Sequence, residues 1–210
     1  MATVFSLLIG YTLGCLHPSA LIGLVKKRDV RREGTHNLGA TNVTFVFGKL
    51  LGLLVMLFDI GKAAGASLLA AYLFPTLSAA GLLAGCGAIL GHIFPFYLGF
   101  RGGKGLAAFA GTVLAYNPRL FLLLLFLGVG LMLAVNYSVA LPYSAAILFC
   151  LLATWESRSF TVFCVTGIAS CIILISHIGN LQRAIKGEDI RVRDAVRRVF
   201  AKKEKEKGQI

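Results

Sequence analysis

Long apolar runs alternate with short polar breaks along this sequence, and the pattern predicts a chain of helices. The runs cover residues 2–24, 50–74, 77–98, 105–116, 119–135, 138–154 and 160–178. None shows the roughly 10-residue alternation of a membrane barrel, so every run is predicted to be a helix. The run at 105–116 is too short to cross a hydrocarbon core of about 30 Å at 1.5 Å per residue, so we expect it to be tilted or to begin below the membrane surface.

Composition places these helices in a membrane. The mean hydropathy is +0.81, and 57% of the residues are apolar. Only 14% are charged, against roughly 25% in soluble domains. The apolar N-terminal run has no positive charge before it, which favours a retained first span over a cleaved signal peptide. The five cysteines all fall in apolar runs and are interpreted as packing residues.

The distribution of positive charge predicts the orientation of the chain. Lys and Arg are concentrated after the first run, in FRGGKG after the third, and in the C-terminal tail, whereas the opposite loops keep only Arg119 and Arg158. Because positive loops stay in the cytoplasm, we expect the N-terminus outside and the C-terminus inside. The predicted fold class is therefore an all-α integral membrane protein of about seven transmembrane helices in the cell membrane.

The tail is interpreted as a separate unit. The sequence divides into a membrane domain at residues 1–182 and a basic tail at 183–210, which holds ten of the 21 Lys and Arg residues. Within the tail, residues 189–203 form an amphipathic pattern expected to lie on the anionic inner leaflet. On a membrane protein this charge indicates lipid contact, and no nucleic-acid partner is predicted.

Small residues recur at the spacing that lets membrane helices approach closely. Three GxxxG pairs are present, Gly61 with Gly65, Gly81 with Gly85, and Gly87 with Gly91. We expect all three to pack against neighbouring helices and assign them no chemistry.

Three polar clusters are predicted to share the cytoplasmic face. The first is GTHNLGATN, from Gly34 to Asn42, whose hydroxyl, amide and backbone N–H groups suit a phosphate. An ordinary polar turn that caps the next helix, with Thr41 or Asn42 as N-cap, is the alternative.

The second cluster is GHIFPFYLGFRGGKG, from Gly91 to Gly105. Glycines that leave N–H groups open, a Lys and a helix start together form an anion site, although the spacing is not that of a nucleotide-binding P-loop. The alternatives are that Arg101 and Lys104 only mark topology and that His92 is a packing residue.

The third cluster is SHIGNLQRAIKGED, from Ser176 to Asp189, in which His177 and Asn180 share a helix face. A helix-end histidine and an interfacial Arg183 are the alternatives. Asp59 and Lys62 lie inside the second run, where a structural pair supporting the site is favoured over a proton path.

These clusters, in this order, resemble the motifs of the acyl-phosphate:glycerol-3-phosphate acyltransferase family (PlsY). NLGATN is similar to its first motif, GHIFPFYLGFRGGKG to its GHxFPxxxxFKGGKG, and the stretch from His177 to Glu188 to its HxxNxxRxxxGxE. The family's DxxK is present as Asp59 and Lys62. The resemblance covers essentially the whole chain and implies a seven-helix bundle with its site toward the cytoplasm.

The resemblance also implies an activity and a set of site residues. The expected reaction transfers a fatty acyl group from acyl phosphate to the sn-1 hydroxyl of glycerol 3-phosphate and gives lysophosphatidic acid, without metal or other cofactor. The hydroxyl proton would pass to the donor's own phosphate or to His177. The expected catalytic residues are His177, Asn180 and Lys104. The expected substrate- and phosphate-binding residues are Thr35, Asn37, Gly39, Thr41, Asn42, His92, Arg101, Gly102, Gly103, Arg183 and Glu188.

The chain departs from the family pattern at several positions. Thr35-His36-Asn37 replaces Ser-Gly-Asn, Phe45 stands where the family has Arg, and Asn136 replaces the Arg of an Arg-Tyr-x-Ser motif. A divergent paralogue that acylates another acceptor is therefore the first alternative, and a non-enzymatic membrane protein is the second.

Overall fold

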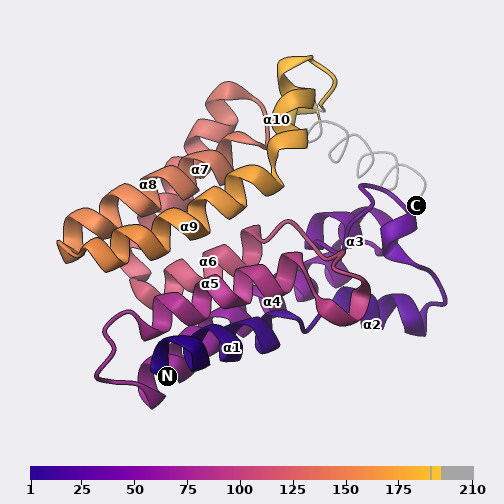
Figure 1. Cartoon of the computed structure of the whole chain (residues 1–210). Coiled ribbons are helices and arrows are strands. Elements are labelled where there is room, and N and C mark those ends of the chain that lie inside the picture. The colour runs from indigo at the N-terminus through magenta and orange to yellow at the C-terminus, as the bar shows by residue number, and fades with distance from the viewer. Residues whose placement is uncertain (190, 195–210) are drawn as a thin grey trace, which may run out of the picture.

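The computed structural model describes residues 1–189 and 191–194, and within them every regular element is a helix. The long helices form a bundle, and the short ones gather at one end of it (Figure 1). The long helices are α1 (Ala2–Gly14), α4 (Lys49–Leu73), α5 (Ala80–Ile93), α6 (Leu106–Tyr116), α7 (Pro118–Val135), α8 (Ala140–Ser157) and α9 (Phe160–Ser176). The short ones are α2 (Pro18–Val25), η1 (Val30–Arg32), α3 (Ala40–Phe47), η2 (Phe96–Leu98) and α10 (Ile178–Ile185).

The predicted runs correspond closely to these helices, with two differences. The first run is broken between α1 and α2, where Pro18 begins the second helix and lacks the N–H that a continuous helix would use. The polar loop before Lys49 contains a helix, α3, that the apolar pattern did not predict, because its eight residues include Thr41, Asn42 and Thr44.

Length and composition support membrane insertion but not a count of seven. In the described part of the chain, five segments are long and apolar enough to cross a membrane, and α9 with α10 would be a sixth, bent by 49°. The remaining apolar helix, α6, has 11 residues, or about 16 Å of helix. Its shortness was predicted.

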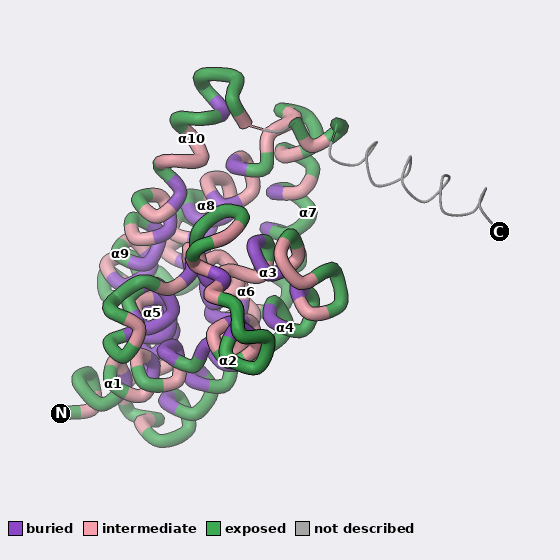
Figure 2. Tube along the Cα trace, turned by 90° about the vertical axis from the view of Figure 1, so that its right-hand side faces the viewer, coloured by how far each residue is buried: buried purple, intermediate pink, exposed green. Residues whose placement is uncertain are grey.

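The helix at the centre of the bundle is α5, which packs against α1, α4, α6 and α9 and is buried along nearly its whole length (Figure 2). Its small residues permit this. A side chain on Gly87 or Gly91 would collide with the backbone of α1 near Tyr11, so these glycines allow close helix approach as predicted.

Of the other two predicted glycine pairs, one packs closely against neighbouring residues and one does not. Gly81 lies close to the backbone of Ser67, and Gly85 lies against Thr112 of α6. The prediction for Gly61 and Gly65 is wrong, because a Cβ at either position would meet nothing within 4 Å. Glycine spacing identifies a smooth helix face, but it does not say whether a partner helix covers that face.

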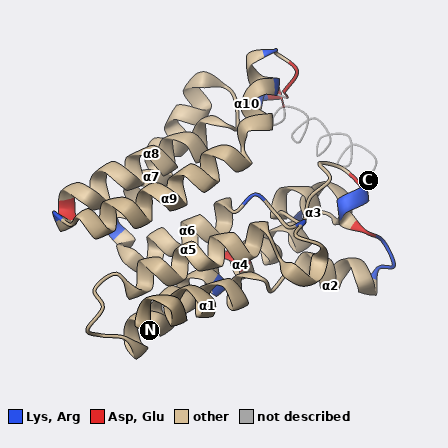
Figure 3. Ribbon diagram, in the orientation of Figure 1, with Lys and Arg blue, Asp and Glu red and all other residues tan. Residues whose placement is uncertain are grey.

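Charged residues are concentrated at the end of the bundle that holds α2, α3 and α10, opposite the N-terminus (Figure 3). The start of the tail returns to this end, where the Val192 and Arg193 N–H groups donate to the backbone and side-chain oxygens of Asn136 at 3.1 and 2.9 Å. Most of the predicted amphipathic segment lies outside the described residues.

Candidate active site

The three polar clusters, far apart in sequence, meet at one end of the bundle, as their shared predicted face required. The Leu38 N–H donates to the Gly102 carbonyl at 3.2 Å, which joins the first cluster to the second. The Ser176 hydroxyl donates to the Lys104 carbonyl at 2.8 Å and joins the second cluster to the end of α9. The Lys104 ammonium donates to Asn180 Oδ1 on α10, which completes the connection.

Lys104 lies at the centre of this arrangement. It comes two residues before α6, and its Nζ shares Asn180 Oδ1 with the Arg183 guanidinium, which donates to that oxygen at 2.7 Å. Burial lowers the pKa of the Lys104 ammonium, and the nearby positive charge of Arg183 lowers it further. Two cations held around one neutral amide oxygen form a positive centre, which is favourable for an anion.

His177 is buried beside this centre, at the bend between α9 and α10. Its Nδ1 lies 3.0 Å from the Ile173 carbonyl and 3.0 Å from the Ser176 hydroxyl. Because a carbonyl only accepts, the contact with Ile173 assigns the ring proton to Nδ1 and leaves Nε2 as an acceptor. A neutral imidazole in this state can take up a proton at Nε2.

The first cluster is organised around Asn42, which is completely buried. Its amide nitrogen donates to the carbonyls of Val30, Glu33 and Asn37 at 2.8–3.0 Å, and its Oδ1 accepts from the Thr35 N–H at 2.6 Å. The side chain is thus occupied inside the loop. The alternative of Thr41 or Asn42 as N-cap is wrong, because Gly39 is the N-cap of α3.

The remaining predicted residues of this loop are more accessible. Thr35 is exposed and its hydroxyl accepts from Asn37 Nδ2 at 3.0 Å, while Asn37 Oδ1 accepts from the Gly39 N–H at 2.9 Å. Thr41 is exposed on α3. His36 has a φ of 56°, a left-handed conformation that costs a non-glycine residue about 1–2 kcal/mol.

The glycines of the second cluster differ from expectation. The N–H groups of Gly102 and Gly103 are not open, since they donate to the carbonyls of Ile93 and His92 at 3.0 Å each. Their role in this structure is close packing, because a side chain at Gly102 would collide with the His92 carbonyl. The positive groups that FRGGKG presents are the side chains of Arg101 and Lys104.

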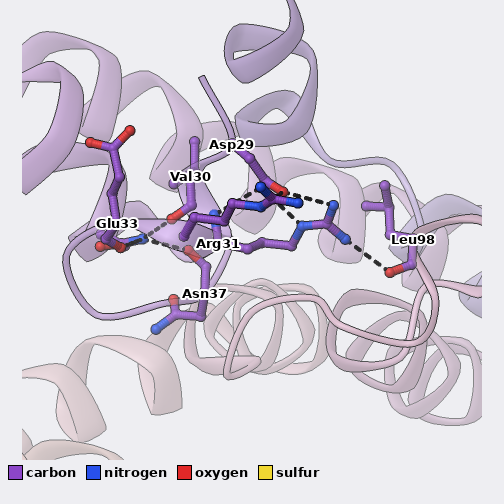
Figure 4. A network of polar contacts seen from close by, with 8 residues as sticks. Asp29, Val30, Arg31, Glu33, Asn37 and Leu98 are labelled. Atoms are coloured by element: carbon purple, nitrogen blue, oxygen red, sulfur yellow. Dashed lines mark hydrogen bonds and ion pairs between the residues drawn. The ribbon is translucent and has the colours of Figure 1, made fainter. Parts of the chain in front are cut away.

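Arg31, which the sequence did not single out, connects the first loop to η2. Its guanidinium donates to both carboxylate oxygens of Asp29 at 3.0 and 3.1 Å and to the Leu98 carbonyl at 3.0 Å (Figure 4). The bond from Arg31 lowers the pKa of the Asp29 carboxyl. The spacing Asp-x-Arg is the only signal that the sequence contains for this bridge.

A cavity of about 570 Å³ opens beside this bridge. It is lined by Asp29, Arg31, Arg32, His36, Ile93, Arg101 and Gly102. Lys104, His177 and Asn180 do not line it. Gly102 belongs to the cavity wall, whereas Lys104, two residues later, turns to α10. The FRGGKG loop therefore has one cation on each side.

Two further predicted residues lie at the edge of the site. Arg183 is exposed, and its backbone carbonyl accepts from the Glu188 N–H at 2.9 Å just after α10. Glu188 is exposed. At the positions that depart from the family pattern, Phe45 is 65% exposed on α3, and Asn136 ends α7 and holds the start of the tail.

In the described part of the chain, a helical bundle with apolar segments long enough to span a membrane and a cationic centre at one end defines a polytopic membrane protein. The family model "Glycerol-3-phosphate acyltransferase" matches residues 4–187. The chain belongs to the glycerol-3-phosphate acyltransferase family.

Curated relatives and solved structures agree with this assignment. The glycerol-3-phosphate acyltransferases of Staphylococcus saprophyticus and Staphylococcus aureus strain RF122 are 34% and 33% identical, each over 92% of this chain and 99% of the relative. The crystal structure of PlsY (YgiH), an integral membrane glycerol 3-phosphate acyltransferase, in its glycerol 3-phosphate form superposes with a TM-score of 0.83 at 30% identity, covering 91% of this chain and 96% of PlsY. Its lysophosphatidic acid form gives 0.81 at 29% identity, covering 91% and 95%.

Proposed function

We propose that this protein transfers a fatty acyl group from an acyl phosphate to the sn-1 hydroxyl of glycerol 3-phosphate and releases lysophosphatidic acid and phosphate. The observation that carries the proposal is the Lys104–Asn180–Arg183 centre, which joins the second and third clusters of a chain that belongs to this family. The PlsY structures with glycerol 3-phosphate and lysophosphatidic acid concern a relative with 30% and 29% identity, and they suggest the same acceptor and product here.

The chemistry needs little from the protein beyond placement of two anions. The acceptor hydroxyl oxygen attacks the acyl carbonyl carbon, the bond from that carbon to the phosphate oxygen breaks, and phosphate leaves with the electron pair. Lys104 and Arg183 stabilise the negative charge that moves onto oxygen, and Asn180 orients both cations. Holding hydroxyl and carbonyl side by side supplies much of the rate, since acyl phosphate is already activated.

The hydroxyl proton has two possible acceptors. One is a phosphate oxygen of the donor, and the other is Nε2 of His177, which the bond to Ile173 leaves unprotonated. His177→Gln, which keeps a polar atom near Nε2 but cannot take up a proton, separates the two routes. A large loss of kcat favours His177 as base, and a small loss favours the donor phosphate.

We further propose seven crossings with the N-terminus outside and the site in the cytoplasm of a cell membrane. Positive residues at the end that holds the clusters support this orientation. Thr35, Asn37 and Arg101 are among the exposed or half-exposed polar groups of the first two clusters, and we propose that they bind phosphate. The basic tail at 183–210 would contact anionic lipid of the same leaflet.

A second candidate is the same transfer to an acceptor other than glycerol 3-phosphate. The exposed Phe45 favours it, because its apolar ring has neither a positive charge nor a hydrogen-bond donor for a phosphate. The two candidates share the donor and the cationic centre, so they differ only in the acceptor pocket.

The test is an assay of purified protein in detergent with palmitoyl phosphate and glycerol 3-phosphate, with the product identified by mass spectrometry and its acylated position by NMR. Palmitoyl-CoA replaces the donor, and glycerol replaces the acceptor, in parallel reactions. Formation of 1-palmitoyl lysophosphatidic acid from palmitoyl phosphate and glycerol 3-phosphate, but not from palmitoyl-CoA, supports the proposal. Transfer only from palmitoyl-CoA, or only to another acceptor, would overturn the corresponding half of it.

A further inference from the structure

Four polar side chains meet in the interior of the bundle, beneath the FRGGKG loop. Asp59 and Lys62 come from α4, His92 from the end of α5, and His17 from the break between α1 and α2. Each is at most 8% exposed. Lys62 Nζ lies 2.7 Å from Asp59 Oδ1, 2.6 Å from the Leu16 carbonyl oxygen and 3.1 Å from His92 Nδ1. The ammonium thus has hydrogen-bond acceptors in Leu16 and His92 and forms an ion pair with Asp59, whose carboxylate oxygens have no hydrogen-bond partner among the described residues.

This arrangement fixes the His92 ring. An ammonium can only donate, so His92 Nδ1 is the acceptor and the ring proton lies on Nε2. Asp59 Oδ1 is 3.4 Å from the same Nδ1, and the ring of His17 packs against His92 with centroids 4.9 Å apart. The ring is held by contacts from two other helical segments.

The opposite edge of the His92 ring lies against Gly103. A Cβ added to Gly103 would collide with Nε2 and lie 3.0 Å from both Cδ2 and Cε1. The Gly103 N–H also donates to the main-chain carbonyl of His92 at 3.0 Å. The ring and the backbone of His92 therefore determine together where Gly103 lies, immediately before Lys104.

We propose that Asp59, Lys62 and His92 are positioning residues, which set the place of the FRGGKG loop and through it the place of Lys104. None of the three is assigned a contact with substrate. The inference rests on the proposed function, because that function gives Lys104 its role at the substrate. It replaces the expectation that His92 binds phosphate directly with a role through Gly103.

Energetics favour such a role over simple stabilisation. A buried ion pair contributes little net stability, since desolvation of both charges offsets their attraction. Charges inside a membrane bundle are costly and are associated with function. The contacts also end at His17, whose two ring nitrogens have no hydrogen-bond partner among the described residues, which does not favour a continuous proton path.

The test is a double-mutant cycle of His92→Asn and Gly103→Ala. Asparagine keeps an acceptor near the Nδ1 position for Lys62 but empties the space beneath Gly103. Alanine at 103 places a methyl group in that space, and Gly103 does not have the positive φ that would exclude alanine. Gly61→Ala is the matched control, because a Cβ there meets nothing within 4 Å. Each protein is measured for Tm in detergent and for kcat and KM with glycerol 3-phosphate and palmitoyl phosphate.

Each single variant is expected to remain folded and to lower kcat/KM about 10-fold, because a small displacement of Lys104 lowers the rate of the reaction. The double variant is expected to recover to within about 3-fold of the wild type, since the methyl group refills the space. A merely structural role would lower Tm without this recovery in kcat/KM. Gly61→Ala is expected to match the wild type in all measurements.

Additive losses in the double variant, or wild-type kcat/KM in His92→Asn, would overturn the inference. If His92→Asn does not fold, the pair Asp59→Asn with Lys62→Met, which leaves no buried charge unpaired, takes its place. That pair is expected to fold with a lowered kcat/KM, and a kcat/KM equal to that of the wild type would overturn the inference. If the wild type has no transferase activity, the proposed function is rejected instead. The double-mutant cycle is then evaluated on Tm, and additive changes in Tm would overturn the inferred contact between His92 and Gly103.

Discussion

Lys104 and Asn180 share a hydrogen bond across 76 residues of sequence, and the Arg183 guanidinium donates to the same amide oxygen. The bond joins the loop before α6 to α10. It gives the two clusters one positive centre, although each cluster alone is also consistent with a purely structural role. Four predictions follow from this geometry and from the loops around it.

Replacing Lys104 by Ala should lower kcat/KM at least about 100-fold, the loss typical of a removed charge-stabilising group. Lys104→Arg should also be poor, because a planar guanidinium cannot occupy the place of a compact ammonium beside Asn180. Steady-state kinetics in detergent measure both. Lys49→Ala, which removes an exposed lysine from the start of α4, is the control. Near-normal activity of Lys104→Ala in a folded protein would remove Lys104 from the site.

The kcat/KM profile should fall on the alkaline side at a lower pH than an ordinary lysine would give. Burial and Arg183 lower the pKa of Lys104 below its usual value of 10.5. The pH dependence of kcat/KM reports the pKa values of groups in the free enzyme. The cation is therefore lost as pH rises through this lowered pKa. Its contribution to the free energy of unfolding has the opposite sign and rises with pH in the same window, because the unfolded chain then binds the extra proton. A profile that stays flat to the pH where free lysine titrates would contradict the assignment.

Asn42→Ala should destabilise the protein by about 2–4 kcal/mol, because it removes four hydrogen bonds of a buried side chain and leaves their partners unpaired. The free energy of unfolding in mixed detergent micelles measures the effect. Thr12→Ala, which removes an exposed hydroxyl on α1 bonded to the Leu8 carbonyl, should change it by less than about 0.5 kcal/mol. A stable Asn42→Ala protein with raised KM would mean instead that the amide binds substrate.

Phe45→Arg should lower KM for glycerol 3-phosphate. A charge-assisted hydrogen bond contributes roughly 1.5–3 kcal/mol, which corresponds to about 10- to 150-fold in KM. Both proteins are compared at one ionic strength, since salt screens exposed charges. Leu50→Arg, at an exposed position on the next helix, is the control for charge alone. An unchanged or higher KM, with little activity in either protein, would favour the second candidate acceptor.

The sequence was sufficient for the helices because in lipid each backbone N–H must be satisfied within its own segment. Apolar runs therefore predict α4, α7, α8 and α9 to within a few residues. Polar loops carry no such constraint. The helix α3 was missed for that reason, since polar residues such as Thr41 are equally typical of loops.

The sequence by itself determined that the chain is a helical membrane protein, that its polar clusters share one end, and that they have the motifs of an acyltransferase family. Only the tertiary structure decided how the members of those clusters are used. It buries Asn42 inside its loop, closes the N–H groups of Gly102 and Gly103 onto carbonyls, and places Lys104 against Asn180. The physical reason is that periodicity and composition describe one segment at a time, whereas the partner of a buried polar group depends on which segments pack beside it.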